Sequence, residues 1–511
     1  MRSRYTAGLA VVAALAAACG STLQTTQSTV GVGPGGVVAT NGAAPGTSGD
    51  SGLTAPSAVP GSTTGGTSSG VGSVVTGSGK TSGGSTTSGP GGTTGPGTTS
   101  GKTSAGAPAV EAPGITATTM YFGDFYSSQL AAADAAIGAS GAEPSYDSRN
   151  VENAYVDYAN KHGGFAGRKL KVIFYNLNLA NPRPTEDAAA CAKWTQDNKV
   201  FAMNGQTDQY RECAEKAGAI SLQSGNDTAA TFKKYPHFVD PVAIRLDRLG
   251  PVTVGGLYKA GYFGSKLGLI TWDDPNYRYA MEKGFLPALA SHGIQPTTPP
   301  VYVSVTQDVN SVAELSSEMA STVQKFKTLG IDHVIISDGA AGIWAGGGLT
   351  LEFMNNAKSQ HYYPRYGENS YNLPGSAELP KDEQDKLIAI LDSDYRPDMD
   401  NGYHPNPQRV KCFKIQTDAG MPPKNDNDQD IAAQYCDLIF FLQRVVNAMP
   451  VLSTNAFIDQ VAQLGTTFAP AAVYGTNFFA GRRDGSDKVR QAEYFQSCDC
   501  LKFSGPPYQP D

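Results

Sequence analysis

Short apolar segments alternate with amphipathic segments along the chain from Met120 onward. The apolar segments have the length of strands buried in a parallel sheet, and the amphipathic segments repeat apolar residues at helical spacing. The first series predicts strands at Met120–Phe125, Leu170–Tyr175, Val200–Asn204 and Ala219–Leu222, with helices at Val151–Lys161, Pro184–Asp197 and Tyr210–Ala217. The second predicts strands at Leu267–Thr271, Val301–Val305 and His333–Ser337, with helices at Tyr277–Ser291, Val312–Leu329 and Leu349–Ser359. The repeated order predicts an α/β fold with two doubly wound parallel-sheet lobes.

The alternation is less regular after about Tyr362. Helices are predicted at Glu383–Asp392, Ile431–Met449 and Asn455–Leu464, and short strands at Val410–Ile415 and Ala471–Thr476. Ligands of doubly wound sheets bind beyond the carboxyl ends of the strands. We therefore expect a ligand cleft between the two lobes, lined by the loops that follow the strands.

A glycine-rich loop, "KHGGFAGRK", lies between the predicted helix ending at Lys161 and the strand beginning at Leu170. A phosphate-binding loop has the opposite order, in which a strand comes first and a helix follows the glycines. Gly163 and Gly164 stand where a helix ends in a left-handed turn. The loop is therefore predicted to be a corner that contacts no ligand.

Residues 1–18 have two arginines followed by an apolar stretch, as a secretory signal peptide does. The cysteine after three alanines, Cys19, resembles the lipidated cysteine of a bacterial lipoprotein, although an ordinary signal peptide with a bystander cysteine is the alternative. Residues 19–113 are almost entirely Gly, Ser, Thr, Pro, Ala and Val and predict a disordered tether. Lipidation at Cys19 would anchor the chain to the outer face of the cell membrane.

Six cysteines remain after Cys19: Cys191, Cys213, Cys412, Cys436, Cys498 and Cys500. An even number in an exported protein favours disulfides, although fifteen pairings are open. Pairing of neighbours, 191–213, 412–436 and 498–500, is the simplest arrangement. A metal site is the alternative, but none of the histidines has ligand spacing from another or from a cysteine, so neither metal nor cofactor is expected.

The composition argues against several classes of function. The net charge of −7 comes with no basic patch for nucleic acid, and no later apolar stretch is long enough to span a membrane. The folded part has no G-x-S-x-G elbow and no G-x-G-x-x-G fingerprint after a predicted strand. Asp273 and Asp274 are paired carboxylates at a strand end, where a turn or helix cap is favoured over acid–base chemistry. No enzyme is indicated.

The segment "NAYVDYANKHGGFAGRKLKVIFYN" resembles the helix, Gly-Gly corner, Gly-Arg-Lys and second strand of type I periplasmic binding proteins, the leucine/isoleucine/valine-binding family of ABC-transporter solute receptors. "DNKVFAMNGQTDQYRECAEKAGAISLQSG", "LGLITWDDPNYRYAMEKGF", "GIDHVIISDGAAG" and "YYPRYGENS" resemble later segments of that family. The resemblance implies two lobes joined by three crossings, residues 114–241 plus 364–470 and residues 242–363 plus 471–511. It also supports the disulfide 191–213.

The resemblance further implies which residues line the ligand cleft. By position they are Tyr126, Ser127, Gln206, Thr207, Asp208, Ser224, Gly225, Tyr277, Asp338, Gly339 and Glu368. Hydroxyls and backbone N–H groups would hold a carboxylate, an acidic side chain an ammonium group, and tyrosine an apolar wall. Gln206-Thr207-Asp208 stands where amino-acid binders usually have a leading serine, and Ser224-Gly225 replaces a small residue and a threonine. A loop hydrogen bond or a helix cap is the alternative role for each residue.

The implied function is that of a lipid-anchored extracytoplasmic receptor. The chain would capture a small polar, amino-acid-like or related ligand by closure of its lobes, like a flytrap, and deliver it to the membrane permease of an ABC transporter. It would do so as a monomer. A ligand sensor for a membrane signalling partner is the first alternative, and an exported hydrolase on a doubly wound scaffold is the second.

Overall fold

A computed structural model gives the fold of the chain. It describes residues 108–129, 145–178, 181, 183–223, 225–264, 266–305, 312–341, 347–375, 379–393 and 406–510. The predicted signal peptide, Cys19 and almost all of the predicted tether lie outside these ranges, as does Ser224.

The first lobe is built on a five-stranded sheet in which all strands are parallel. Its order across the sheet is β3 (Lys169–Asn176), β2 (Thr119–Tyr126), β4 (Ala202–Asn204), β5 (Ile220–Leu222) and β6 (Phe238–Val239). The predicted strands from Met120 to Leu222 are thus confirmed, each within two residues of its expected ends. A small parallel pair, β1 (Ala109–Val110) with β12 (Val451–Leu452), lies apart from this sheet.

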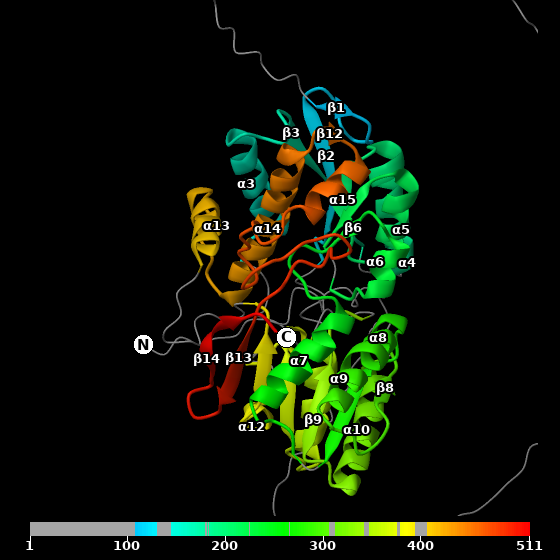
Figure 1. Cartoon of the computed structure of the whole chain (residues 1–511), viewed down its shortest axis with the longest axis vertical. Helices are drawn as coiled ribbons and strands as arrows, with labels where there is room; N and C mark the ends of the chain where they lie inside the picture. The colour runs from blue at the N-terminus through cyan, green and yellow to red at the C-terminus, as the bar shows by residue number, and fades with distance from the viewer. Residues whose placement is uncertain are drawn as a thin grey trace, which may run out of the picture. The chain divides into compact units, whose positions relative to one another are not determined.

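Helices cover both faces of the first sheet (Figure 1). Met120 and Phe122 of β2 share a buried cluster with α3 (Ser148–Lys161), α13 (Pro407–Asp418), α14 (Asp426–Ala448) and α15 (Thr454–Ala462). Tyr121 and Phe125 point to the opposite face, because successive strand residues alternate, and pack on α4 (Arg183–Ala192), the π-helical turn η1 (Lys193–Asp197) and α5 (Asp208–Ala217). A short helix, α6 (Ala229–Lys234), precedes β6.

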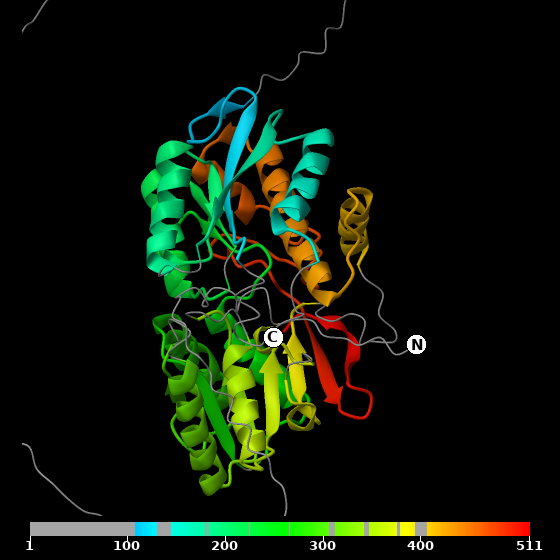
Figure 2. The ribbon, with the colours of Figure 1, turned by 180° about the vertical axis from the view of Figure 1, so that it is seen from behind.

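The second lobe is built on a seven-stranded sheet. Its order is β14 (Cys500–Tyr508), β13 (Val489–Phe495), β11 (Ile388–Leu391), β10 (Arg365–Asn369), β9 (His333–Ser337), β7 (Leu267–Trp272) and β8 (Val301–Val303). The five strands from β11 to β8 are parallel, and the hairpin β13–β14 adds two antiparallel strands at one edge (Figure 2).

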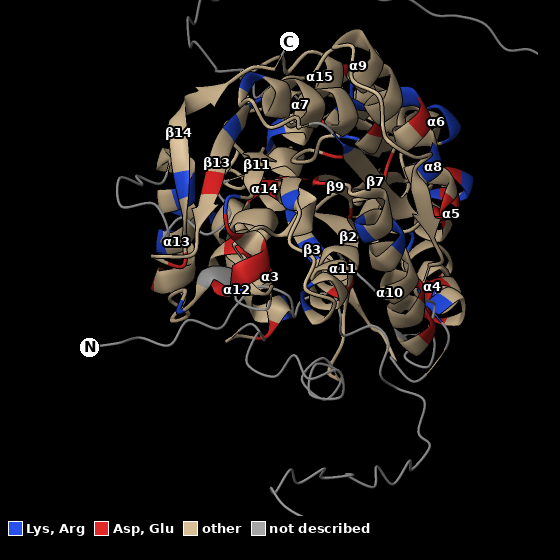
Figure 3. Cartoon of the chain, turned by 90° about the horizontal axis from the view of Figure 1, so that it is seen from below, with Lys and Arg blue, Asp and Glu red and all other residues tan. Residues whose placement is uncertain are grey.

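Helices also lie on both sides of the second sheet, and Figure 3 shows α7 and α9 on one side and α10 and α11 on the other. They are α7 (Leu246–Lys259), α8 (Pro275–Ala280), the turn η2 (Met281–Phe285), α9 (Leu286–Ser291), α10 (Val312–Leu329), α11 (Gly348–Ser359), the 3-10 turn η4 (Ser370–Asn372) and α12 (Lys381–Gln384). The two doubly wound lobes of the expected α/β fold are confirmed.

The chain passes between the two sheets three times, as the family resemblance implied: after β6, after β11 and before β13. One expected boundary has to be moved. Residues from 364 were assigned to the first lobe, but β10 and β11 pair with β9 in the second sheet. The chain returns to the first lobe only after Leu391, and α13, α14 and α15 then pack on that lobe.

Two secondary-structure predictions are wrong. Val410–Ile415 was predicted as a strand because its apolar residues nearly alternate, but it lies within α13, which Asn406 caps and Pro407 begins. Glu383–Asp392 was predicted as a helix, but its continuous apolar part forms β11, whose four residues are all buried. An unbroken apolar run is typical of a parallel strand covered on both faces.

No named strand corresponds to the prediction at Ala471–Thr476, where the described residues form only isolated bridges such as Ser393 with Val473. Several described elements had no sequence prediction, among them α7, β10 and the hairpin β13–β14. Pro251 and two adjacent glycines within α7 obscure its helical pattern.

The glycine-rich loop is the predicted corner. The helix α3 ends at Lys161, and Gly163 and Gly164 follow with φ of 102° and 61°. A Cβ atom on Gly164 would lie 2.5 Å from the carbonyl oxygen of Arg168. The loop stands at the start of β3, opposite the carboxyl ends where ligands of such sheets bind.

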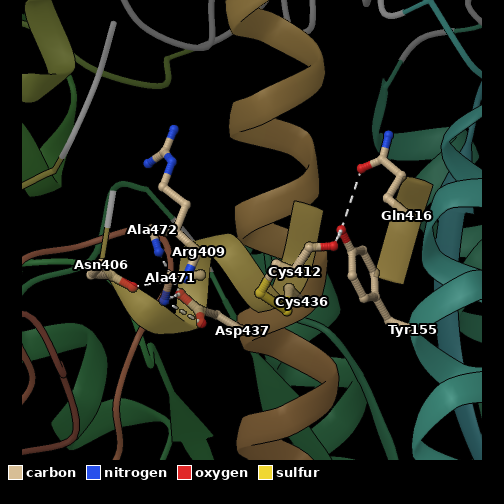
Figure 4. Close-up of a disulfide and its surroundings, with 9 residues drawn as sticks. All are labelled: Tyr155, Asn406, Arg409, Cys412, Gln416, Cys436, Asp437, Ala471 and Ala472. Carbon is tan, nitrogen blue, oxygen red and sulfur yellow. Dashed lines mark hydrogen bonds between the residues drawn. A yellow bond between two sulfur atoms is a disulfide. The ribbon is translucent and has the colours of Figure 1, made fainter. Parts of the chain in front are cut away.

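The three disulfides join neighbouring cysteines: 191–213, 412–436 and 498–500. The second fastens α13 to α14, and Figure 4 shows its surroundings. The Tyr155 hydroxyl of α3 donates to the Cys412 carbonyl oxygen at 3.3 Å, so three helices meet there. Nearby, the buried Asp437 carboxylate accepts hydrogen bonds from the backbone N–H groups of Ala471 and Ala472 at 2.7 and 2.8 Å.

Candidate functional site

The two lobes contact each other where their parallel strands end. The Asn226 side chain, just after β5, donates to the Ala340 carbonyl oxygen after β9 at 3.4 Å. The Thr231 hydroxyl donates to Asn276 Oδ1 at 3.3 Å, and the Ala229 N–H donates to Asp247 Oδ1 at 2.8 Å. The carboxyl ends of both sheets therefore border the same region, where the cleft was predicted.

Three of the predicted cleft residues come together at this border. Tyr277 of α8 is fully buried and donates its hydroxyl to the Ala340 carbonyl oxygen at 3.1 Å. A Cβ atom on Gly339 would lie 2.4 Å from the Tyr277 hydroxyl oxygen and 3.6 Å from the Gly225 carbonyl oxygen. Gly225 comes from the first lobe and the other two from the second, so this cluster joins the lobes. Burial raises the pKa of the Tyr277 phenol well above its usual value, so the hydroxyl stays protonated.

Asp338 was predicted to contact ligand. Donors of the second lobe already occupy the acceptor positions of its carboxylate. Its carboxylate accepts from Trp272 Nε1 at 3.0 Å, from the Gly339 N–H at 2.7 Å, and from the Thr350 N–H and hydroxyl at 2.9 Å. A carboxylate offers about four acceptor positions. Burial raises the pKa of Asp338 to about 6, although the four donors oppose this shift. These contacts tie the end of β9 to β7 and to α11.

Glu368 of β10 differs from Asp338 in lacking partners. Its side chain is fully buried, and neither carboxyl oxygen has a hydrogen-bond partner among the described residues. Burial, and then the charge of Asp338, raise the pKa of Glu368 well above its usual value. Asp227 in the first lobe, two residues after Gly225, is likewise buried with both carboxyl oxygens unpaired, and burial raises its pKa to about 7. A buried carboxyl group without a partner is costly unless it is protonated or meets a ligand.

The predicted loop after β4 has structural contacts. The Thr207 hydroxyl accepts from the Tyr210 N–H at 3.3 Å and so caps α5. Asp208 is half exposed and pairs with Arg211 at 3.0 Å and Lys234 at 3.3 Å. The Gln206 side-chain oxygen accepts from Arg183 Nη2 at 3.3 Å. Thr207 thus has the helix-cap role that was the alternative to ligand contact, whereas Asp208 forms ion pairs, a role that was not predicted for it.

Tyr126 and Ser127 end the strand β2. The guanidinium carbon of Arg149 lies 3.9 Å from the centroid of the Tyr126 ring, and Arg149 pairs with Asp147. The Ser127 hydroxyl accepts from the Gln129 N–H at 3.1 Å within a turn. These residues stand at the carboxyl end of β2, on the side where the cleft was predicted, and no hydrogen bond among the described residues joins them to the Tyr277 cluster.

Several residues at this edge were not assigned to the ligand cleft from the sequence: Arg149, Arg183, Asn226, Asp227, Asn276 and Tyr371. Asn226, Asp227 and Asn276 lie in the segments "LQSGND" and "TWDDPNY", which follow predicted strands and so were expected at the cleft, but none of the three was given a ligand role. Arg149 and Arg183 belong to helices, so the expectation that ligands bind beyond the ends of strands did not include them.

Neither a metal centre nor a membrane span emerges from the described residues. Within those ranges no three His, Cys, Asp or Glu side chains converge as metal ligands. No described helix combines the length and the apolar character needed to cross a bilayer.

Residues 136–497 match the sequence profile of the family described as "Periplasmic binding protein". A Desulfitobacterium hafniense ABC-transporter substrate-binding protein in complex with Leu has 16% identity and a TM-score of 0.52, covering 76% of this chain and all of that one. A Rhodopirellula baltica protein described as a possible leucine/isoleucine/valine-binding protein has 14% identity and a TM-score of 0.53, over 76% and 97% of the chains.

A third similar structure is a Rhodopseudomonas palustris solute-binding protein in complex with p-hydroxybenzoic acid, with 12% identity and a TM-score of 0.55 over 77% and 98% of the chains. At this identity the structures establish the fold alone. No curated protein sequence matches the chain. The family match spans well over half of the chain, and the two lobes have the arrangement expected of it. The chain therefore belongs to the periplasmic binding protein family and has the type I fold of ABC-transporter substrate-binding proteins.

Proposed function

We propose that this protein is a lipid-anchored, non-catalytic receptor that captures a small polar ligand between its lobes and delivers it to an ABC-transporter permease. The observation that carries the proposal is the cluster of Gly225, Tyr277 and Gly339, because it brings both lobes together at the carboxyl ends of their strands. Rotation of the lobes about their crossings would open and close this border.

We infer that the ligand is amino-acid-like or a related small carboxylate or amide. Hydrogen-bonding groups at the border could hold such a ligand, and the similar structures from D. hafniense and R. palustris hold leucine and p-hydroxybenzoic acid. Glu368 and Asp227 add buried carboxyl groups that could accept from a ligand N–H or donate, when protonated, to a ligand oxygen. Tyr126, Ser127 and Gln206 would complete the wall on the first lobe.

A thermal-shift screen of residues 106–511 tests the proposal. Amino acids, amides, small aliphatic and aromatic acids, polyamines, sugars and nucleosides would be offered. A ligand at 100 times its Kd stabilises the folded state by about 2.7 kcal/mol, which raises Tm by several degrees. The proposal requires a hit whose mass is unchanged after incubation. Chemical conversion of the hit would support the hydrolase alternative instead, and the absence of any hit would count against small-solute capture.

The anchor is tested separately with Cys19. We expect the secreted chain to carry a lipid on Cys19 and to sediment with membranes. Cys19→Ser should leave the chain soluble, while Cys498→Ser, which changes a cysteine of the folded part, should leave it membrane-bound. An unmodified mature N-terminus by mass spectrometry would exclude lipidation.

A further inference from the structure

Two carboxyl groups are buried together under the first sheet, close to its cleft edge. Asp124 lies two residues before the end of β2, and Glu152 lies in α3, which packs on the same face of the sheet. Their exposed fractions are 1% and 0%. Asp124 Oδ2 and both oxygens of Glu152 have no donor among the described residues. Neither residue was assigned to the candidate site.

The surroundings of the pair provide no compensating charge. Asp124 Oδ1 accepts from the Phe125 N–H at 2.7 Å and from Asn204 Nδ2 at 3.1 Å. The titratable groups that face the pair are acidic: the Tyr435 phenol of α14, which bonds Ser148, and Asp147 beyond it at the start of α3. Arg149 of α3 pairs with Asp147 and lies over the Tyr126 ring, and among the described residues no lysine, arginine or histidine is a main influence on the pKa of either carboxyl group.

A proton on one of the two carboxyl groups removes the repulsion between two buried negative charges. Two carboxylates only accept hydrogen bonds, so the unpaired oxygens of Asp124 and Glu152 can bond to each other only when one of the two groups carries a proton. Burial raises the pKa of Asp124 to about 7. Burial, followed by the charge of Asp124, raises the pKa of Glu152 well above its usual value. Above about pH 7 the pair therefore holds one proton, with Glu152 donating to the Asp124 carboxylate.

The pair is connected to the loop after β4 by a single side chain. Asn204 donates from Nδ2 to Asp124 Oδ1 and accepts at Oδ1 from the Gln206 N–H at 3.0 Å. This second bond fixes the backbone of Gln206, the first residue of the predicted Gln206–Asp208 loop. The amide orientation of Asn204 thus depends on Asp124, and the loop depends on Asn204.

We propose that Asp124 and Glu152 share one proton and, through Asn204, act as positioning residues for the loop at Gln206. The inference rests on the proposed function only in assigning that loop to the ligand cleft. When the shared proton passes to solvent, two like charges remain in a buried site, and their repulsion moves Asp124 away from its present contacts. The loop then loses the bond that holds it.

The first test measures the unfolding equilibrium of the full chain between pH 5 and pH 8. Above about pH 4.5 the unfolded chain has released the protons of both acids. Each proton that the folded pair still keeps raises the unfolding constant about tenfold per pH unit until that acid titrates in the folded chain. Glu152→Gln keeps the size of the side chain and donates an N–H to Asp124 without titrating. We expect its profile to lack that tenfold factor per pH unit.

The matched control is Glu314→Gln, which changes an exposed glutamate of α10 and should keep the wild-type slope. A Glu152→Gln slope equal to that of the wild type would overturn the proton-sharing pair. If Glu152→Gln does not fold, Asp124→Asn supplies the same comparison, because it also removes one of the two acids.

The second test follows the loop by hydrogen exchange of the peptide that contains the Gln206 amide. After correction for the intrinsic rate, we expect protection in the wild type to fall about tenfold per pH unit above the titration of the pair. In Glu152→Gln the protection should be independent of pH. Equal pH dependence in both proteins would refute the positioning role.

Neither measurement uses a ligand. A chain that binds no solute but shows the expected exchange profiles would contradict the proposed function and retain the proton pair. A chain that binds a solute but shows no such profiles would support the receptor function and contradict the proton-sharing pair.

Discussion

At the scale of single residues, Gly339 sets how closely the chain after β9 approaches the Tyr277 hydroxyl at the border between the lobes. Its φ of 150° is one that side chains rarely adopt, and the Tyr277 hydroxyl occupies the space of a Cβ atom. The only residue without a Cβ is therefore required there, both for backbone conformation and for the contact with Tyr277.

Gly339→Ala should push Tyr277 out of its bond to Ala340 and lower the free energy of unfolding by about 1–3 kcal/mol. Affinity for any ligand found in the screen should fall as well. Gly255→Ala is the control, because no atom lies within 4 Å of a Cβ there and the residue is in α7. Urea denaturation measures both, and an equal effect of the two substitutions would contradict this role for Gly339.

Glu368→Gln should change how stability depends on pH. The pKa of Glu368 is raised in the folded chain, so that chain binds a proton that the unfolded chain releases. The contribution is complete below the unfolded pKa of about 4.3 and is lost, at up to about 1.4 kcal/mol per pH unit, as pH rises toward the folded value. The glutamine variant should lose less stability between pH 5 and pH 8. Identical denaturation profiles would show that Glu368 is ionised in the folded state.

At the scale of elements, the corner between α3 and β3 is held from outside as well as by its glycines. The Gly164 carbonyl oxygen accepts from Gln443 Nε2 at 3.0 Å and from Asn447 Nδ2 at 3.1 Å, both on α14. A helix nearly 280 residues away in sequence thus fixes the turn, and the disulfide 412–436 fixes that helix to α13.

Gly164→Val should destabilise the first lobe by about 1–3 kcal/mol, because the positive φ and the Arg168 carbonyl oxygen both oppose a side chain. Gly163→Ala is the control and should destabilise less. The φ of Gly163 is also positive, but nothing lies within 4 Å of a Cβ atom there. Ligand affinity of the folded fraction should be unchanged in both variants. A selective loss of affinity in Gly164→Val would contradict the structural role of this corner.

At the scale of the whole folded part, the three crossings are bonded to one another. The first and third run side by side, with the Asp240 N–H donating to the Arg483 carbonyl oxygen at 3.0 Å and the Gly485 N–H to the Asp240 carbonyl oxygen at 2.8 Å. The second joins them where the Tyr474 N–H donates to the Asp392 carbonyl oxygen at 3.1 Å. The buried Asp484 accepts from Arg245 and Arg248, which lie at the start of α7.

Asp484→Asn should cost about 3–5 kcal/mol of unfolding free energy, because it removes the shared anionic partner of two largely buried arginines. Asp459→Asn, on an exposed position of α15, should cost less than about 0.5 kcal/mol. Thermal or urea denaturation distinguishes them. A small effect of Asp484→Asn would mean that backbone contacts alone hold the crossings together.

The sequence was sufficient for the lobes because most of their strands are short apolar runs separated by regular amphipathic helices. It was insufficient where a short apolar segment is ambiguous: Val410–Ile415 was predicted as a strand but is capped by Asn406 and begun by Pro407 as part of a helix. For the site, the strand ends indicated the border at which the two lobes meet. Residue type could not separate a ligand contact from the cap that Thr207 makes, since both use the same hydroxyl. Asp124 lies within a largely apolar strand and was not selected from the sequence. Its partner Glu152 comes close to it only when α3 packs on the sheet.

The bonded crossings constrain how the protein can move. Three independent linkers would allow the lobes to twist, slide and tilt separately. Because the linkers share backbone hydrogen bonds and the Asp484 ion pairs, a displacement of one carries the others with it. The linked crossings should therefore allow the lobes to rotate about a single axis. Substitutions at the crossings, far from the predicted cleft, should alter the rate at which the lobes open without altering which ligand binds.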